Sequence, residues 1–274
     1  MKKQCAQRMT LYAALLGAVL CAVTCPSPRA AQTNPAPVRG EQWSAIGRLP
    51  DFWRGTWFTR KFRYDFTRLP PLTKNAAAAA SAYLREQTRG RNLDTSVANC
   101  TSPGMPAVMD DGSMPIKFLP TPEMIVIYLE GYSQARFVHM DGRRHAQPPN
   151  PTFLGESIGH WEGDTLVVDT IGFVPQVRLP VRPGSNPRAP ALLPHGPNMR
   201  IVERFRLLTD DTLEVKRTLY DDALFTQPVE HVRHFHRDTS REGELQEWVC
   251  SDNRDYFDEA TGILYYGLHT GPTR

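Results

Sequence analysis

Two apolar runs flank a tight turn in Ser157-Ile-Gly-His-Trp-Glu-Gly-Asp-Thr-Leu-Val-Val-Asp-Thr170, where Glu162, Gly163 and Asp164 form the reversal. Short strands joined by so tight a turn pair antiparallel. Similar units recur between residues 128 and 250, and successive hairpins of this kind curl into a barrel or a sandwich. The sequence therefore predicts a mainly β fold, an antiparallel up-and-down (lipocalin-like) barrel or a sandwich, with one N-terminal helix and long Pro-rich loops.

The two-residue period predicts where the strands lie. We expect them at residues 115–119, 124–130, 134–140, 157–162, 165–172, 200–208, 212–219, 228–237 and 245–250. The reversals fall at Glu130-Gly131, Asp141-Gly142, Gly163-Asp164 and Asp210-Asp211, which have the residue types of tight turns.

One helix is expected, from Asn75 to Gln87, because five consecutive alanines and Leu84 favour that conformation, with Thr73 as its N-cap. In contrast, residues 174–198 hold seven prolines and show no periodic pattern. So long an interruption within a compact domain is typical of a functional loop, and a lid over a barrel mouth is one interpretation.

The N-terminus has the pattern of an export signal: Lys2, Lys3 and Arg8 precede an apolar run over residues 11–24. We therefore predict a signal peptide at 1–31, a flexible lead-in at 32–50 and a single domain at 51–274. The apolar run is short for a bilayer, so no membrane span is expected after signal removal. These features predict an exported protein, periplasmic or secreted.

Removal of residues 1–31 changes the charge, because they hold four of the 32 basic residues and none of the 29 acidic ones. The remaining 28 basic residues form no basic stripe, so a nucleic-acid partner is not expected. Cys100 and Cys250 also remain after cleavage. In an oxidising compartment they form either a disulfide bridge, which we favour, or a pair of buried thiols.

Carboxylates on apolar strand faces are the first candidates for chemistry. Alternation places Glu203 with Ile201 and Phe205, and it likewise places Asp169 and Glu247 among apolar neighbours. A buried carboxylate is costly unless it is paired. Two hypotheses follow: acid–base groups in a lumen, or structural pairs with arginines inside a barrel.

Histidines at strand ends are the second candidates. His139, Asp141, Arg143 and His145 gather around one turn, where arginine would hold an anion and histidine would move a proton; a solvated hairpin tip is the alternative. His160 and His195 also fall near turns. The spacing of His231, His234 and His236 lacks the accompanying ligands of a metal site, so no metal and no cofactor are expected.

The chain resembles a widespread group of exported bacterial β-rich proteins. The resemblance covers residues 51–253 and is carried by Asp141-Gly-Arg-Arg-His145, the 157–170 segment, Arg200-Ile-Val-Glu-Arg-Phe205 and Glu247-Trp-Val-Cys250. It implies export and a β-rich fold and transfers no mechanism. At the level of fold alone, the Gly55-Thr-Trp57 entry and the strand meander are similar to lipocalin-like barrels.

These features predict an exported protein that holds a small, largely apolar organic molecule in a barrel lumen. Tyr128, Trp161 and Phe205 would line the lumen, with Arg143, Arg200 and Asp169 as polar contacts. An alternative is a cofactor-independent lyase, hydratase or isomerase that uses Glu203 with His160 or His195. An envelope scaffold that binds a protein partner is a further alternative.

Overall fold

The computed structural model describes residues 39–59, 70–91, 93, 100–110, 114–181, 190–238, 245–248, 256–258 and 263–265. The chain divides into two compact units, Met1–Pro37 and Val38–Arg274, and every described residue belongs to the second. The expected signal peptide and Cys250 lie outside the described residues. Export and the disulfide bridge therefore stay predictions.

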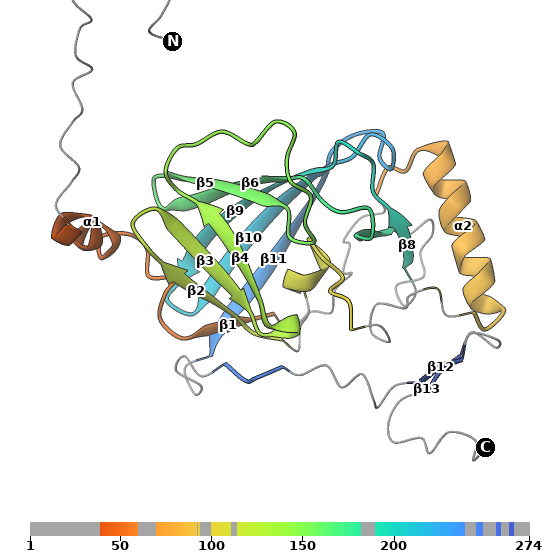
Figure 1. The fold of residues 1–274 in the computed structure, drawn as a ribbon, viewed down its shortest axis with the longest axis horizontal. Helices are drawn as coiled ribbons and strands as arrows, with labels where there is room; N and C mark the ends of the chain where they lie inside the picture. Colours follow the sequence, from red (N-terminus) through yellow and green to blue (C-terminus); the bar gives the residue numbers. More distant parts are fainter. Residues whose placement is uncertain are drawn as a thin grey trace, which may run out of the picture. The chain divides into compact units, whose positions relative to one another are not determined.

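Nine strands close into a barrel in the order β1-β11-β10-β9-β6-β5-β4-β3-β2 (Figure 1). Their bounds are β1 Thr56–Phe58, β2 Ile116–Pro120, β3 Met124–Leu129, β4 Gln134–His139, β5 Glu156–Glu162, β6 Thr165–Ile171, β9 Arg200–Thr209, β10 Thr212–Tyr220 and β11 Val229–Asp238. Closure pairs every strand on both sides, which removes the exposed edges of an open sheet. Of the predicted alternatives, a barrel or a sandwich, the structure is a barrel, and eight of the nine predicted strands are confirmed.

One pair of neighbouring strands departs from the expected antiparallel order. β4 and β5 run parallel, with Val138 opposite Ser157 and His139 opposite Ile158. Parallel neighbours cannot be joined by a tight hairpin, because the chain must first return to the end where it started. Residues 140–155 make this crossover, so the predicted reversal at Asp141-Gly142 is instead its beginning.

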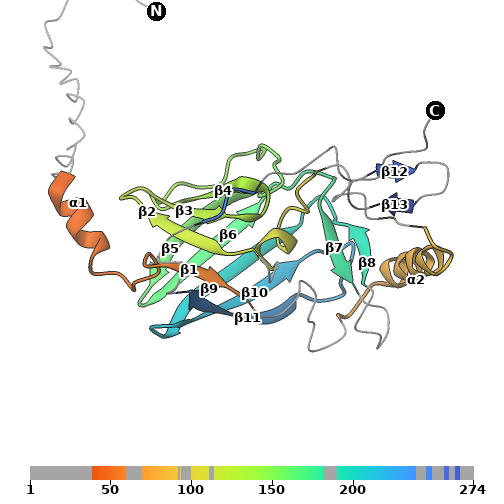
Figure 2. The same ribbon diagram turned by 90° about the horizontal axis from the view of Figure 1, so that it is seen from below.

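The predicted helix is present as α2, Lys74–Thr88, and Thr73 is its N-cap, since its side-chain oxygen accepts from the Ala76 amide at 3.2 Å. A second helix, α1 (Arg39–Ile46), lies within the predicted lead-in and was not expected. Two short 3₁₀ helices also occur, η1 (Ala107–Asp110) and η2 (Gly131–Ser133). Figure 2 shows α1 and α2 at opposite ends of the barrel, here named the α1 end and the α2 end.

The Pro-rich segment contains structure that the sequence pattern did not reveal. β7 (Arg178–Val181) pairs with β8 (Ala191–Pro194) in an antiparallel hairpin at the α2 end, and residues 182–189 lie outside the description. A further small pair joins β12 (Tyr256–Asp258) to β13 (Ile263–Tyr265). The strand predicted at 245–250 is wrong over its described part, 245–248, where Glu247 is exposed.

The barrel interior is filled by side chains in two zones. Near the α1 end it is apolar: the ring of Phe118 lies 5.6 Å from Phe52 and 5.8 Å from Phe205, and all three are fully buried. Toward the α2 end the inward side chains become polar, because Arg136, Glu203 and other residues point inward there. η1 contributes buried side chains to this second zone.

Candidate functional site

Glu203 lies inside the barrel between two arginines. One carboxylate oxygen is 2.5 Å from Arg136 of β4, and the other accepts from Arg217 of β10 at 3.0 Å. None of the three side chains is more than 1 % exposed. Arg136 also donates to the hydroxyls of Ser157 and Thr170, at 3.0 Å and 2.8 Å. The carboxylate is thus a counter-ion for two buried guanidinium groups.

Asp110 extends this network from η1. Its Oδ2 accepts from Arg217 at 2.7 Å and lies 3.6 Å from His231 and 3.8 Å from Arg233, both on β11. The Met109 sulfur, next to it in η1, lies 2.9 Å from Arg136. The 3₁₀ helix is therefore tied to β10 and β11 by the charge of Asp110 and to β4 by the Met109 sulfur.

Burial and the arginines act oppositely on the two carboxyl groups. Burial alone would raise the pKa of Glu203, but the charges of Arg136 and Arg217 hold it below its ordinary value. At Asp110 burial would also raise the pKa, but Arg217 and His231 lower it by more, so the pKa lies below its ordinary value. The pKa of His231 is lowered, chiefly because burial disfavours its charged form. Both carboxylates are therefore ionised in the folded protein at neutral pH.

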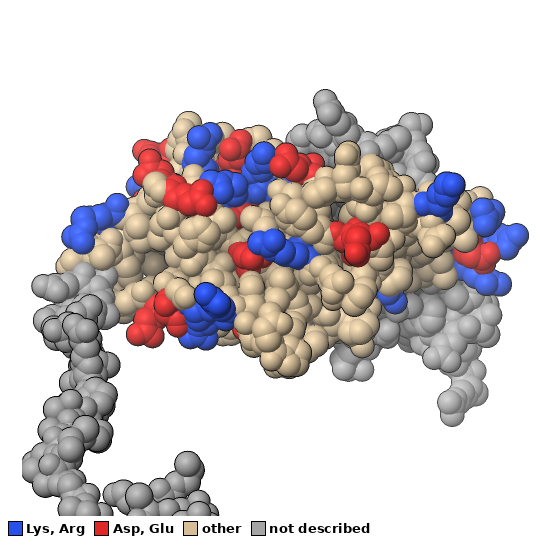
Figure 3. Space-filling model, turned by 90° about the horizontal axis from the view of Figure 1, so that it is seen from above, with Lys and Arg blue, Asp and Glu red and all other residues tan. Residues whose placement is uncertain are grey.

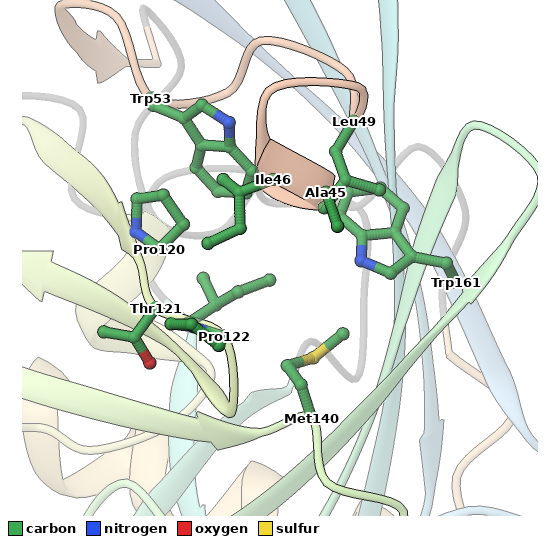
Figure 4. Close-up of a pocket in the computed structure, with 10 residues that line it drawn as sticks. Ala45, Ile46, Leu49, Trp53, Pro120, Thr121, Pro122, Met140 and Trp161 are labelled. Carbon is green, nitrogen blue, oxygen red and sulfur yellow. The ribbon is translucent and has the colours of Figure 1, made fainter. Parts of the chain in front are cut away.

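A pocket of about 340 Å³ lies at the α1 end of the barrel (Figure 4). Its walls come from α1 and the segment after it, the β2–β3 turn, the end of β4 and the end of β5. The lining residues are Ala45, Ile46, Leu49, Trp53, Pro120, Thr121, Pro122, Ile125, Met140 and Trp161. Its size is within the range of small-molecule sites, and its lining is nearly all apolar.

The aromatic wall of this pocket is held by the apolar core. The Trp161 ring stacks on the buried Phe52 ring, with centroids 5.7 Å apart and planes at 29°. Arg237, whose side chain lies over the Trp57 ring at 4.3 Å, donates to the carbonyls of Asp51 and Arg54. These bonds hold the chain on both sides of Phe52. The pocket wall next to the barrel is therefore formed before any ligand enters.

A second hollow, of about 510 Å³, lies between α2 and β8. It is lined by Ala79, Ala82, Tyr83, Arg85, Glu86, Leu93, Arg178, Leu192, Leu193 and Pro194. Arginine and glutamate side chains form part of its lining, and it is the more open of the two hollows. The pocket at the α1 end is accordingly the better enclosed site for an apolar molecule.

Ion pairs cover the outer face of the strands and the crossover. Arg200 binds Asp169 through two bonds of 2.7 Å and 2.9 Å. His145 of the crossover lies 3.0 Å from Glu156 and 3.7 Å from Asp169. Figure 3 shows basic and acidic side chains interspersed over one face, with no broad region of a single sign. The Arg200–Asp169 pair joins β9 to β6, and His145 ties the crossover to β5 and β6.

Several predicted catalytic residues lie apart. Glu203 points inward, as alternation predicts, whereas His160 is on the outer face of β5, 61 % exposed, beside Glu162. His195 contacts the carbonyl oxygens of Gly196 and Val174. The structure does not join either histidine to Glu203. His139 ends β4, facing outward because its neighbour Val138 is buried inside.

Other predicted residues lie outside the barrel interior, in the crossover or on the outer face of a strand. Asp141 pairs with Arg143 at 2.5 Å, and this bond, chiefly, lowers the pKa of Asp141 to about 2. Asp169 also faces outward, which corrects its predicted inward position, because the adjacent Thr170 points into the barrel and binds Arg136. Because β6 has apolar residues on both of its faces, the sequence does not show which residues point into the barrel.

Of the predicted aromatic lining, Trp161 lines the pocket at the α1 end. Phe205 is buried in the apolar core, and Tyr128 is half-buried on β3, opposite Lys117 and Ala135. Neither of these two residues lines the pocket.

The two arginine partners of Glu203 were not predicted from the sequence. Arg136 and Arg217 have the same inward parity as buried apolar neighbours on their strands, so the alternation that identified Glu203 would have identified them as well. Asp110 carries no such signal, because it lies in a 3₁₀ turn outside the strands, 107 positions before its partner Arg217. Trp53 and Met140 also lie outside the strands, so alternation does not identify them as pocket residues.

Within the described residues, no group of histidine, cysteine and acidic side chains is arranged to hold a metal ion. The described helices include none with the length and hydropathy needed to cross a bilayer. No protein-family model, curated protein or solved structure matches the chain. Fold and site together define a closed nine-strand barrel whose described interior holds buried apolar and ionic side chains, with an apolar pocket at one end.

Proposed function

We propose that the protein binds a small, largely apolar organic molecule in the pocket at the α1 end. The observation that carries this proposal is the pocket itself, about 340 Å³ and lined by indole, proline, methionine and aliphatic side chains. Burial of apolar ligand surface against such a lining supplies the free energy of binding.

The proposed site is the mouth of the barrel and not its centre. Phe52, Phe118 and Phe205 fill the interior next to the pocket, and the ion network around Glu203 fills the zone beyond them. A ligand in the centre would have to displace these buried side chains, whereas a ligand at the mouth would contact Trp53, Met140 and Trp161 without doing so.

Titration with N-phenyl-1-naphthylamine, an uncharged probe that fluoresces in apolar surroundings, tests the proposal. We expect saturable binding of one probe per chain. Met140→Lys should weaken binding at least about ten-fold, because the ammonium group would lose water in the pocket. Phe137→Lys is the matched control, since Phe137 is 53 % exposed on the outer face of β4. Equal affinity of the two variants would contradict the proposed site.

We further propose that the protein is exported and loses its first residues, near position 31. The basic and apolar segments of the N-terminus support this proposal. Cell fractionation followed by intact-mass measurement tests it. A full-length chain recovered from the cytoplasmic fraction would refute the proposal.

A further inference from the structure

We infer that the occupant of the pocket is an uncharged aromatic molecule that carries one hydrogen-bond acceptor, placed against Trp161. This inference rests on the proposed function and narrows it to a chemical class. It depends on three properties of the lining: its charge, the shape of its side chains and its one inward polar group.

The absence of charge in the lining excludes an ionic ligand. None of the ten lining residues has an ionisable side chain. A carboxylate, phosphate or ammonium group in the pocket would therefore give up its hydration with no counter-charge in contact, which is strongly unfavourable. The ligand has to be neutral in its bound form.

The shapes of the lining side chains favour a planar ring. Figure 4 shows the indoles of Trp53 and Trp161 on opposite sides of the pocket, with the ring of Pro120 on the same side as Trp53 and with Pro122 and the thioether of Met140 along the side that joins them. Indole faces and edges bind aromatic rings in offset or edge-to-face contacts. A methionine sulfur also makes favourable contacts with aromatic rings. A flat molecule meets more of this surface than a puckered one.

One polar group of the lining remains for the ligand. Neither indole nitrogen of the lining has a hydrogen-bond partner among the described residues. The Trp53 nitrogen, however, is buried in the wall, whereas Figure 4 shows the Trp161 nitrogen directed toward the space between Ala45 and Met140. The Thr121 hydroxyl, in contrast, already donates to the Met124 carbonyl at 3.0 Å. The indole N–H can only donate, so the matching ligand group is an acceptor such as a carbonyl or ether oxygen. A sugar, with many hydroxyls, would leave most of them without partners.

Equilibrium dialysis with three related probes tests the class of ligand. The probes are 2-acetylnaphthalene, its ring-saturated decalin analogue and 2-naphthoate, which differ from one another in planarity or in charge. We expect 2-acetylnaphthalene to bind at least about ten-fold more tightly than either of the others, because only it is both planar and neutral.

Trp161→Phe tests the hydrogen bond and keeps a ring in place against Phe52. It should weaken 2-acetylnaphthalene about five-fold, the effect of one net hydrogen bond. It should leave the affinity for naphthalene, which has no acceptor, nearly unchanged. An equal loss for both probes would show that Trp161 contributes packing alone and would overturn the assignment of an acceptor.

The outcomes separate this inference from the proposed function. If the decalin analogue or 2-naphthoate binds as tightly as 2-acetylnaphthalene, the pocket still binds small molecules but the aromatic, uncharged class is wrong. If none of the probes, including N-phenyl-1-naphthylamine, binds saturably, the proposed function fails and the inference fails with it.

Discussion

Glu203 shows how a residue that resembles a catalytic group is used in this barrel. Alternation along β9 correctly predicts that the carboxylate points inward, and burial of a carboxylate is a common sign of a functional site. Here, however, both oxygens face guanidinium groups, at 2.5 Å from Arg136 and 3.0 Å from Arg217. With its partners this close, the carboxylate compensates buried positive charge.

Glu203→Gln is expected to destabilise the fold. The substitution leaves Arg136 and Arg217 buried without their shared counter-ion, and breaking a buried ion pair in this way costs about 3–5 kcal/mol. Urea unfolding measures the loss. Glu162→Gln is the control, because Glu162 pairs with Arg204 on the exposed face and its loss should change little. A Glu203→Gln variant as stable as the parent would show that the network is not needed for folding.

Gly159→Ala is expected to alter the pocket through Met140. A methyl group at Gly159 would lie 2.6 Å from the Met140 sulfur and 2.7 Å from a Val138 methyl, so the neighbouring side chains must move. Overpacking of this kind costs about 1–3 kcal/mol, and displaced Met140 would reduce the affinity for N-phenyl-1-naphthylamine. Gly47→Ala, whose added methyl meets only the Ser44 carbonyl at 3.6 Å, should leave both quantities unchanged.

Among the elements, η1 and the crossover have the clearest structural roles. η1 carries Met109 and Asp110 into the polar zone of the barrel, where they contact β4, β10 and β11. The crossover over residues 140–155 joins the parallel strands, and His145 anchors it to β5 and β6. Each element is held by side chains that bind barrel strands: Asp110 reaches β10 and β11, and His145 reaches β5 and β6.

Asp110→Asn is expected to loosen η1. Without the carboxylate charge, the bond to Arg217 weakens and the turn opens more often. The amides of Val108 and Met109, which donate to Gly104 and Pro106 at 2.9 Å and 3.2 Å, should then exchange hydrogen at least about ten-fold faster. Asp141→Asn, in an exposed pair with Arg143, is the control. Unchanged exchange in the Asp110 variant would mean that packing alone holds η1.

For the molecule as a whole, the buried network predicts acid sensitivity. The folded-state pKa values of Asp110, Glu203 and His231 all lie below their ordinary values, so the unfolded chain takes up protons that the folded protein does not. The stabilisation is complete above about pH 6.5 and decreases as the pH falls, first through His231 and then, below about pH 4.5, through the carboxyl groups.

Thermal unfolding between pH 8 and pH 3 measures this dependence. We expect a constant Tm from pH 8 to about pH 7 and a progressive fall at lower pH, steepest below pH 4.5. In the Asp110→Asn variant the Tm should fall less steeply below pH 4.5, because one of the two titrating carboxyl groups is absent. A Tm that stays constant down to pH 3 would contradict the assigned protonation states.

Local patterns in the chain suffice to predict most of the strands, a barrel or sandwich as the fold class, α2 with its Thr73 cap, and the inward position of Glu203. They depend on the two-residue alternation of strands, on turn residues and on helix propensity, all of which act between residues near in sequence. The sequence predicts an inward Asp169, but its side chain faces outward. The prediction is wrong because β6 has apolar residues on both faces, so apolar neighbours do not reveal which way a side chain points.

The parallel pairing of β4 with β5, the entry of Asp110 into the ion network and the pocket at the α1 end arise only in three dimensions. Each brings together residues from separate segments: Asp110 lies 107 positions from its partner Arg217, and the pocket combines Trp53 with Trp161. Contacts of this kind depend on how the closed barrel positions its ends. No periodicity or spacing within one segment encodes that arrangement.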